Sequence, residues 1–157
     1  MSFTFNDCAG AWKGTTRLYL SWPPEREDVS ESRLEARVEL GGLALSVRYT
    51  WAFEGRPQEG LMVVTLDRRT GQATGAWADT FHQQPALMAL AGALQEDGVS
   101  VRGEYAAPEG PPWGWRIALR WQGGAQLLLE MDNITPEGEA APAVRAEYRR
   151  AGATADQ

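Results

Sequence analysis

The sequence is poor in the residues that form disulfides and metal sites. Cysteine occurs once, at Cys8, and histidine once, at His82, among 157 residues. A single cysteine cannot form an internal disulfide, and it leaves no cluster of metal-ligating side chains. We therefore predict neither a disulfide framework nor a metal site, and we interpret Cys8 as an incidental thiol near a loose N-terminus.

Basic clusters and long apolar runs are lacking as well. The net charge is -6, and the adjacent basic pairs are limited to Arg68-Arg69 and Arg149-Arg150. Such a surface has no patch to neutralise a phosphate backbone. No run approaches the roughly 18 apolar residues of a membrane helix, and the N-terminus has no basic segment followed by an apolar one. We expect one domain over residues 1–157, cytoplasmic, with no nucleic-acid or membrane partner.

Alternation of apolar and polar residues runs through almost the whole chain. In AWKGTTRLYLSW, from Ala11 to Trp22, every second residue from Trp12 is apolar or small, which is typical of a half-buried strand. Further segments of this kind bring the predicted number of strands to about ten, over residues 10–150. The segment 85–94, PALMALAGAL, also suits a helix, but we favour a strand because the following hairpin needs a partner.

Short turns between these segments predict which residues face each other. The predicted turns are Gly41-Gly42, 55–58, 68–71, Asp97-Gly98 and 123–125. They predict the pairs Leu40/Leu43, Leu34/Tyr49, Trp51/Met62, Met62/Trp77, Leu94/Val101 and Arg116/Asp132. In these pairings the apolar face of each strand lies beside the apolar face of the next strand. We therefore predict an all-β protein, a single antiparallel up-and-down barrel. A two-sheet β-sandwich is the alternative.

The connections fall into two classes that lie at opposite ends of such a barrel. Alternate ones are tight, whereas the others are mostly longer and contain proline, as in 23–30, 107–112 and 135–142. Five of the seven tryptophans fall near the long loops. We predict a ligand pocket at that end. Its predicted lining is Trp22, Trp51, Phe53, Met62, Trp77, Asp79, Tyr105, Trp113, Trp115 and Met131.

Asp79 is an unusual residue in this arrangement, because it shares the inward face with Trp77. Its predicted level in the barrel is that of Gly60 and Phe53, and the arginines of the strands face outward. A carboxylate among aromatic rings must accept hydrogen bonds from indole, tyrosine or backbone donors, or bind something from outside. Asp79 would therefore tie down the end of its strand, anchor the polar group of a ligand, or act as an acid or base.

His82 falls by alternation on the face opposite Trp77, where it would be a solvated loop residue. It is nevertheless the one candidate in this chain for the proximal ligand of a haem. We predict no cofactor, with His82 kept as a weak haem candidate.

The ordered motifs AWKGT, LDRRTG before GAWADT, LQEDG, DNITPEG and AEYRR resemble those of the bacterial domain-of-unknown-function family 1579. The resemblance covers about residues 10–150 and implies a calycin-like barrel, the group of the lipocalins, fatty-acid-binding proteins and nitrobindin-type haem barrels. The Trp-x-Asp pair of that family matches Trp77 and Asp79. The chain has no histidine in its C-terminal strands, which argues against the haem chemistry of the nitrobindin type.

We thus expect a binding protein rather than an enzyme, one that takes a small apolar or aromatic molecule at its long-loop end. One alternative is an isomerase-like or cyclase-like enzyme that uses Asp79 in the same pocket. Another is a structural or interaction barrel with a filled interior. The protein would be a monomer, or a homodimer through an outward strip containing Ala91, Ala93 and Leu128.

Overall fold

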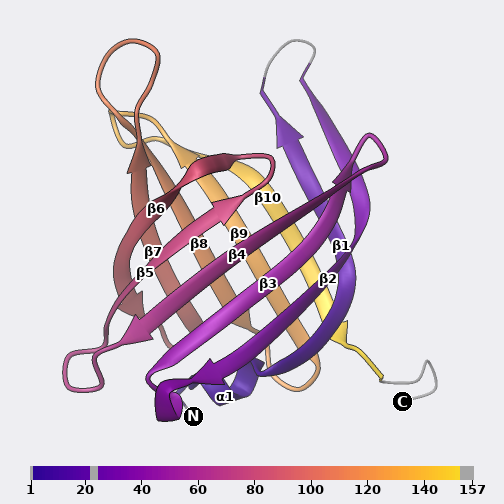
Figure 1. Cartoon of the computed structure of the whole chain (residues 1–157), viewed down its shortest axis with the longest axis vertical. Coiled ribbons are helices and arrows are strands. Elements are labelled where there is room, and N and C mark those ends of the chain that lie inside the picture. The colour runs from indigo at the N-terminus through magenta and orange to yellow at the C-terminus, as the bar shows by residue number, and fades with distance from the viewer. Residues whose placement is uncertain (1, 22–24, 153–157) are drawn as a thin grey trace.

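The computed structural model describes residues 2–21 and 25–152. Within these ranges ten antiparallel strands follow one another around a closed barrel, and the first pairs with the last (Figure 1). The strands are β1 (Gly10–Leu20), β2 (Arg26–Glu39), β3 (Ala44–Phe53), β4 (Arg56–Leu66), β5 (Gln72–Asp79), β6 (Gln83–Leu94), β7 (Gly98–Tyr105), β8 (Trp113–Trp121), β9 (Gln126–Ile134) and β10 (Ala140–Arg150). The predicted barrel is confirmed, and the sandwich is not formed.

Alternation places one face of each strand in a continuous core. Along β8, for example, Trp115, Ile117 and Leu119 are buried, whereas Arg116 and Arg120 lie outside. The segment 85–94 is a strand, as predicted, because β7 takes its hydrogen bonds from β6 along Ala91–Leu94. The helical preference of alanine and leucine is thus overridden by pairing.

Three of the predicted registers are confirmed. Leu34 faces Tyr49 between β2 and β3, Met62 faces Trp77 between β4 and β5, and Arg116 faces Asp132 between β8 and β9. In each case the turn and the alternation indicated the same pairing.

The register between β3 and β4 was predicted wrongly. The connection is the two-residue turn Glu54-Gly55, in which both residues have positive φ, and not a loop over 55–58. Consequently Trp51 faces Gln58, and Met62 faces Val47. The shift is an even number of residues, so every side chain keeps the face that alternation gave it.

Two other turns also differ from prediction. Leu94 faces Val99 and not Val101, because the turn of this hairpin lies at 96–97, with Gln95 donating to Gly98. The β2–β3 turn includes Leu40 and Leu43, which are 70% and 42% exposed, so these two leucines are not part of the core. Strands β2 and β10 begin earlier than expected, at Arg26 and Ala140, which shortens the predicted loops 23–30 and 135–142.

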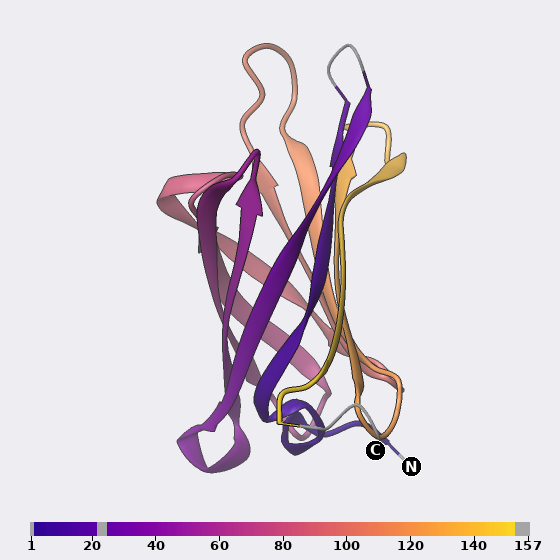
Figure 2. The same cartoon turned by 90° about the vertical axis from the view of Figure 1, so that its right-hand side faces the viewer.

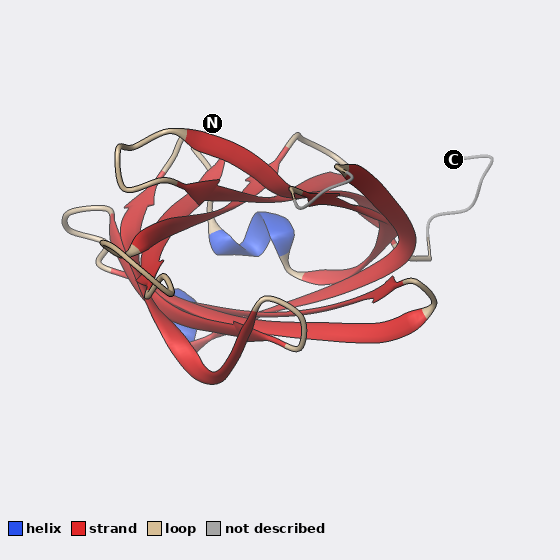
Figure 3. Ribbon diagram, turned by 90° about the horizontal axis from the view of Figure 1, so that it is seen from above, coloured by secondary structure: helices blue, strands red, loops and turns tan. Residues whose placement is uncertain are grey.

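The end with the tight turns is closed by a segment of the chain that precedes the barrel. Helix α1 (Phe5–Cys8) lies within the outline of the barrel when it is viewed from above (Figure 3). Phe3, Phe5 and Cys8 are buried, and Trp12 Nε1 donates to the Cys8 carbonyl over 2.8 Å. The expectation of an incidental Cys8 in a loose N-terminus is therefore wrong, because residues 3–8 contribute to the core.

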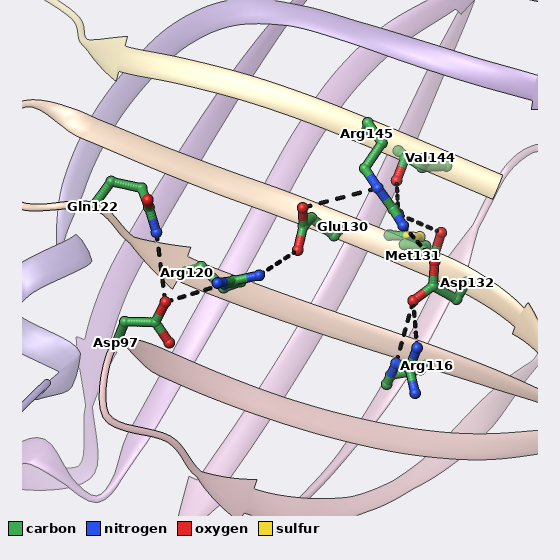
Figure 4. A network of polar contacts seen from close by, with 9 residues as sticks. All are labelled: Asp97, Arg116, Arg120, Gln122, Glu130, Met131, Asp132, Val144 and Arg145. Atoms are coloured by element: carbon green, nitrogen blue, oxygen red, sulfur yellow. Dashed lines mark hydrogen bonds and ion pairs between the residues drawn. The ribbon is translucent and has the colours of Figure 1, made fainter. Parts of the chain in front are cut away.

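The opposite end carries the long connections, seen at the top of Figures 1 and 2. On the outside, a chain of ion pairs crosses the C-terminal strands (Figure 4). Asp132 accepts hydrogen bonds from Arg116 and Arg145, while Glu130 lies between Arg145 and Arg120, and Arg120 also reaches Asp97. Among the described residues, no helix is long and apolar enough to cross a membrane.

Candidate functional site

Asp79, the last residue of β5, holds the turn that follows the strand. Its Oδ1 accepts the backbone amides of Phe81 and His82, over 2.8 Å and 2.5 Å. The pairing of β5 with β6 shifts in register between Trp77 and Asp79, and the strand ends at Asp79. The carboxylate therefore shapes the turn at residues 80–82.

The second oxygen of Asp79 belongs to a buried hydrogen-bonded chain. The Tyr49 hydroxyl donates to Asp79 Oδ2 over 2.9 Å, and Trp77 Nε1 donates to the Tyr49 hydroxyl oxygen over 2.8 Å. Tyr49 reaches Asp79 across Gly60, which pairs with both residues. A Cβ at Gly60 would lie 2.0 Å from the Tyr49 ring, so only glycine leaves room for this contact.

Asp79 is enclosed, with 4% of its surface exposed. Burial by itself would raise the pKa of its carboxyl group, but the neighbouring His82 and the amides of His82 and Phe81 outweigh burial and lower the pKa below 3.8. Burial, together with the Asp79 charge, raises the pKa of Tyr49 well above 10.0. At neutral pH the pair is a carboxylate that accepts a hydrogen bond from a neutral phenol.

The His82 side chain packs among aromatic side chains and does not extend into solvent. Its imidazole stacks on Trp51 at 5.9 Å between centroids, and it lies 4.8 Å from Phe81 and 5.0 Å from Trp115. The side chain is 14% exposed, and Nδ1 lies 3.5 Å from Asp79 Oδ1. The expected solvated position is wrong, because the turn that Asp79 holds reverses the side of the chain on which His82 falls.

A cavity of about 260 Å³ opens at the long-loop end, beside these residues. One wall is the pair Trp77 and Trp115, whose rings stack at 5.4 Å with an angle of 9° between their planes. His82, Met88 and Tyr105 line it further, and the Tyr105 hydroxyl donates to Asn133 Oδ1. The other lining residues are Leu18, Tyr19, Leu20, Ser21, Phe81, Gln83, Asn133, Ala141, Pro142 and Ala143.

Two buried nitrogen atoms at this site have no hydrogen-bond partner among the described residues. They are Trp115 Nε1 and His82 Nδ1. The geometry of the 3.5 Å contact between Nδ1 and Asp79 Oδ1 is not that of a hydrogen bond, although the two groups attract each other electrostatically if Nδ1 carries the proton. Unpaired buried donors are uncommon in native proteins and call for an explanation.

The predicted lining residues are placed at different depths. Trp77, Tyr105 and Trp115 line the cavity. Trp51 and Phe53 pack against Phe81 and do not line the cavity themselves. Asp79 does not line it either, but it accepts the backbone amide of the lining residue His82. Met62 and Met131 are buried in the core, and Trp113 is half-buried opposite Tyr105. Trp22 lies outside the described residues.

Sequence reasoning missed most of the lining residues, and with them the contributions of Tyr49, Asn133 and His82 to the polar groups of the site. Tyr49 was assigned to the core without its link to Asp79, Asn133 was not assigned to the pocket, and His82 was assigned to the wrong face. A signal existed for Tyr49: reading Glu54-Gly55 as the hairpin turn would have placed Tyr49 beside Gly60 and hence beside Asp79. For His82 there was none, since a turn has no alternation.

The arrangement does not fit a haem. Pockets for drug-sized ligands begin at roughly 300 Å³, and the cavity is smaller than that. A porphyrin is larger than most drug-sized ligands, so the cavity is too small to enclose it. In addition, the imidazole is packed against Trp51, Phe81 and Trp115. Among the described residues, no group of three or more potential metal ligands occurs either.

A closed up-and-down barrel of ten strands, with an aromatic cavity at its long-loop end, has the architecture of a calycin-like protein. The chain belongs to the family described as "Protein of unknown function (DUF1579)", whose model matches residues 4–150. A comparison with curated proteins finds no match.

Two solved structures share the fold at low sequence identity. Rv2717c from M. tuberculosis has a TM-score of 0.61 and 12% identity, covering 92% of each chain. The S-type phycobiliprotein lyase CPES from Guillardia theta has a TM-score of 0.57 and 13% identity, covering 96% of this chain and 92% of its own. Both likenesses concern the fold alone.

Proposed function

We propose that this protein binds a small aromatic or largely apolar molecule in the cavity at its long-loop end. The observation that carries the proposal is the stacked pair Trp77 and Trp115, which forms one wall of a cavity of about 260 Å³. Aromatic walls with a few convergent polar groups are typical of small-molecule sites. The same fold is used by a protein named as a phycobiliprotein lyase, which agrees with binding but identifies no ligand.

The size of the cavity limits the ligand. A volume of about 260 Å³ is slightly below the usual range of pockets for drug-sized ligands, which begins at roughly 300 Å³. This corresponds to one aromatic ring with a small substituent. Nitrobenzene is a suitable probe, because it has this size and quenches tryptophan fluorescence on contact.

The alternatives have less support. The enzyme that uses Asp79 needs the carboxyl group in contact with the ligand, but its oxygens already accept hydrogen bonds from Tyr49, Phe81 and His82. Its lowered pKa also makes it a poor proton donor at neutral pH. A completely filled barrel agrees with the packed tight-turn end but does not account for the cavity of about 260 Å³ at the other end. Whether the protein is a monomer or a homodimer remains a prediction.

Filling the cavity tests the proposal. Ala143 lines it and is 8% exposed, so in Ala143→Phe the added ring would occupy the ligand's space. We expect wild-type protein to bind nitrobenzene saturably, as measured by tryptophan quenching, and the variant to lose at least tenfold in affinity.

The matched control is Ala91→Phe, which adds the same ring on the outer side of β6. It should bind nitrobenzene as the wild type does. Equal binding by Ala143→Phe, with an unchanged circular dichroism spectrum, would show that the cavity is not the site. Native mass spectrometry of freshly purified protein would also reveal a ligand retained from the expression host.

A further inference from the structure

The polar groups of the cavity restrict the chemistry of the ligand. Among the described lining residues there is no Asp, Glu, Lys or Arg, so the cavity offers no fixed charge to pair with an ionised ligand. The polar side chains include His82, Asn133 and Tyr105. The Tyr105 hydroxyl already donates to Asn133 Oδ1. Of the ring nitrogens at the cavity, His82 supplies the one that can accept a hydrogen bond from a ligand, because an indole N–H such as that of Trp115 can only donate.

The surroundings of His82 determine which nitrogen carries the proton. Nδ1 is enclosed and lies 3.5 Å from Asp79 Oδ1, with no other polar partner among the described residues. A lone pair on Nδ1 would be repelled by the carboxylate, whereas an N–H is attracted to it. Asp79 itself is held by Tyr49 and by two backbone amides, so it cannot turn away. In its neutral form the imidazole thus carries its proton on Nδ1 and its lone pair on Nε2.

We infer that the ligand is an aromatic molecule with an acidic O–H or N–H group, a phenol or an N–H heteroaromatic compound, which donates a hydrogen bond to His82 Nε2. Asp79 is then a positioning residue, which acts through the imidazole and does not touch the ligand. This inference rests on the proposed function, since it requires the cavity to be the binding site.

The lowered pKa of Asp79 agrees with this role, because the carboxylate stays ionised at neutral pH and continues to attract Nδ1–H. The aromatic wall of Trp77 and Trp115 would stack against the ring of the ligand. A phenol satisfies both features at once: its ring is apolar, and its hydroxyl is a strong donor.

A pair of probes of similar size tests the inference. 4-Nitrophenol carries the donor, and nitrobenzene lacks it. The readout is the ratio of their dissociation constants, measured by tryptophan quenching below the pKa of the free phenol. A hydrogen bond in a partly buried site corresponds to roughly a tenfold difference in affinity. We expect wild-type protein to prefer 4-nitrophenol by about that factor, and we expect the absorption of the bound phenol to shift towards that of phenolate.

In His82→Phe the ring remains and the acceptor is removed, so the ratio should fall to about one. In Asp79→Asn the charge beside Nδ1 is removed, and the ratio should fall several-fold. Tyr148→Phe controls for loss of stability alone, because Tyr148 lies buried in the core, where its hydroxyl bonds to Ser32. Its ratio should equal that of the wild type.

The outcomes separate the two proposals. If nitrobenzene does not bind to wild-type protein, the proposed function fails. If it binds, but 4-nitrophenol shows no preference, or the same preference in His82→Phe, the inference about the donor fails and the binding site stands. If His82→Phe loses the preference and Asp79→Asn keeps it, the positioning role of Asp79 is overturned.

Discussion

At the scale of single residues, Tyr49 links two other buried polar groups, Trp77 and Asp79, and alternation alone gave no sign of this link. Its hydroxyl accepts from Trp77 Nε1 and donates to Asp79 Oδ2. Tyr49→Phe would leave a buried N–H unpaired and would remove one donor from a buried carboxylate. Because unsatisfied buried groups are costly, we expect a loss of about 3 kcal/mol in the free energy of unfolding, measured with urea.

The control for this prediction is Tyr148→Phe. There the hydroxyl contacts Ser32, which still donates to the Thr50 carbonyl when the tyrosine hydroxyl is removed. The expected loss is about 1 kcal/mol. Equal losses in the two variants would show that the chain from Trp77 to Asp79 has no special importance for stability.

At the scale of elements, alternation and turns carry different information. Alternation fixes which face of a strand is buried, and an error of two or four residues in register leaves that face unchanged. The fold could therefore be predicted although two hairpins were displaced. The site could not, because the neighbour of Asp79 depends on the register: the displaced β3–β4 hairpin placed Phe53 where the structure has Tyr49.

Helix α1 is the element that the pattern did not indicate, since four residues are too few to show a period. Its burial gives Cys8 a measurable property. Burial raises the pKa of the Cys8 thiol to about 12, and the residue has no exposed surface. We expect a thiol reagent at neutral pH to label Cys8 only as fast as the native protein unfolds. Phe5→Ala should accelerate this labelling and lower the free energy of unfolding by about 3 kcal/mol.

The exposed neighbour Asn6 provides the comparison. Asn6→Ala lies in the same short helix but removes no buried surface, so its labelling rate should stay close to that of the wild type. Rapid labelling of the native wild-type protein would mean that residues 3–8 do not close the barrel in solution.

At the scale of the whole molecule, the two ends of the barrel differ in their packing. The tight-turn end is packed by α1 and Trp12, whereas the other end leaves a cavity lined by residues of β1 and of β5 to β10. Closure of the sheet removes exposed strand edges, so the open end can be varied without loss of the barrel. Stability should therefore be governed by the core and by the outer ion pairs, and less by the cavity.

The outer network makes that stability depend on pH. Burial by itself would raise the pKa of Asp132, but hydrogen bonds from Arg145 and Arg116 outweigh it and lower the pKa below 3.8. Asp79 is shifted in the same direction. Protons then bind more tightly to the unfolded chain, so the stabilisation is complete above the unfolded-state pKa and is lost as the pH falls through the lower folded-state values.

Urea unfolding at a series of pH values from neutral to strongly acidic measures this dependence. Wild-type protein should lose stability steadily as the pH falls below about 3.8. Asp132→Asn should be less stable at neutral pH and should lose less on acidification, because the linked carboxyl group is gone. Glu54→Gln, which removes a more exposed partner of Arg26, should change neither quantity appreciably. If Asp132→Asn keeps the full slope of the wild type, the acid sensitivity must come from other carboxyl groups, and the chain of ion pairs across β8, β9 and β10 would contribute little to holding the barrel together.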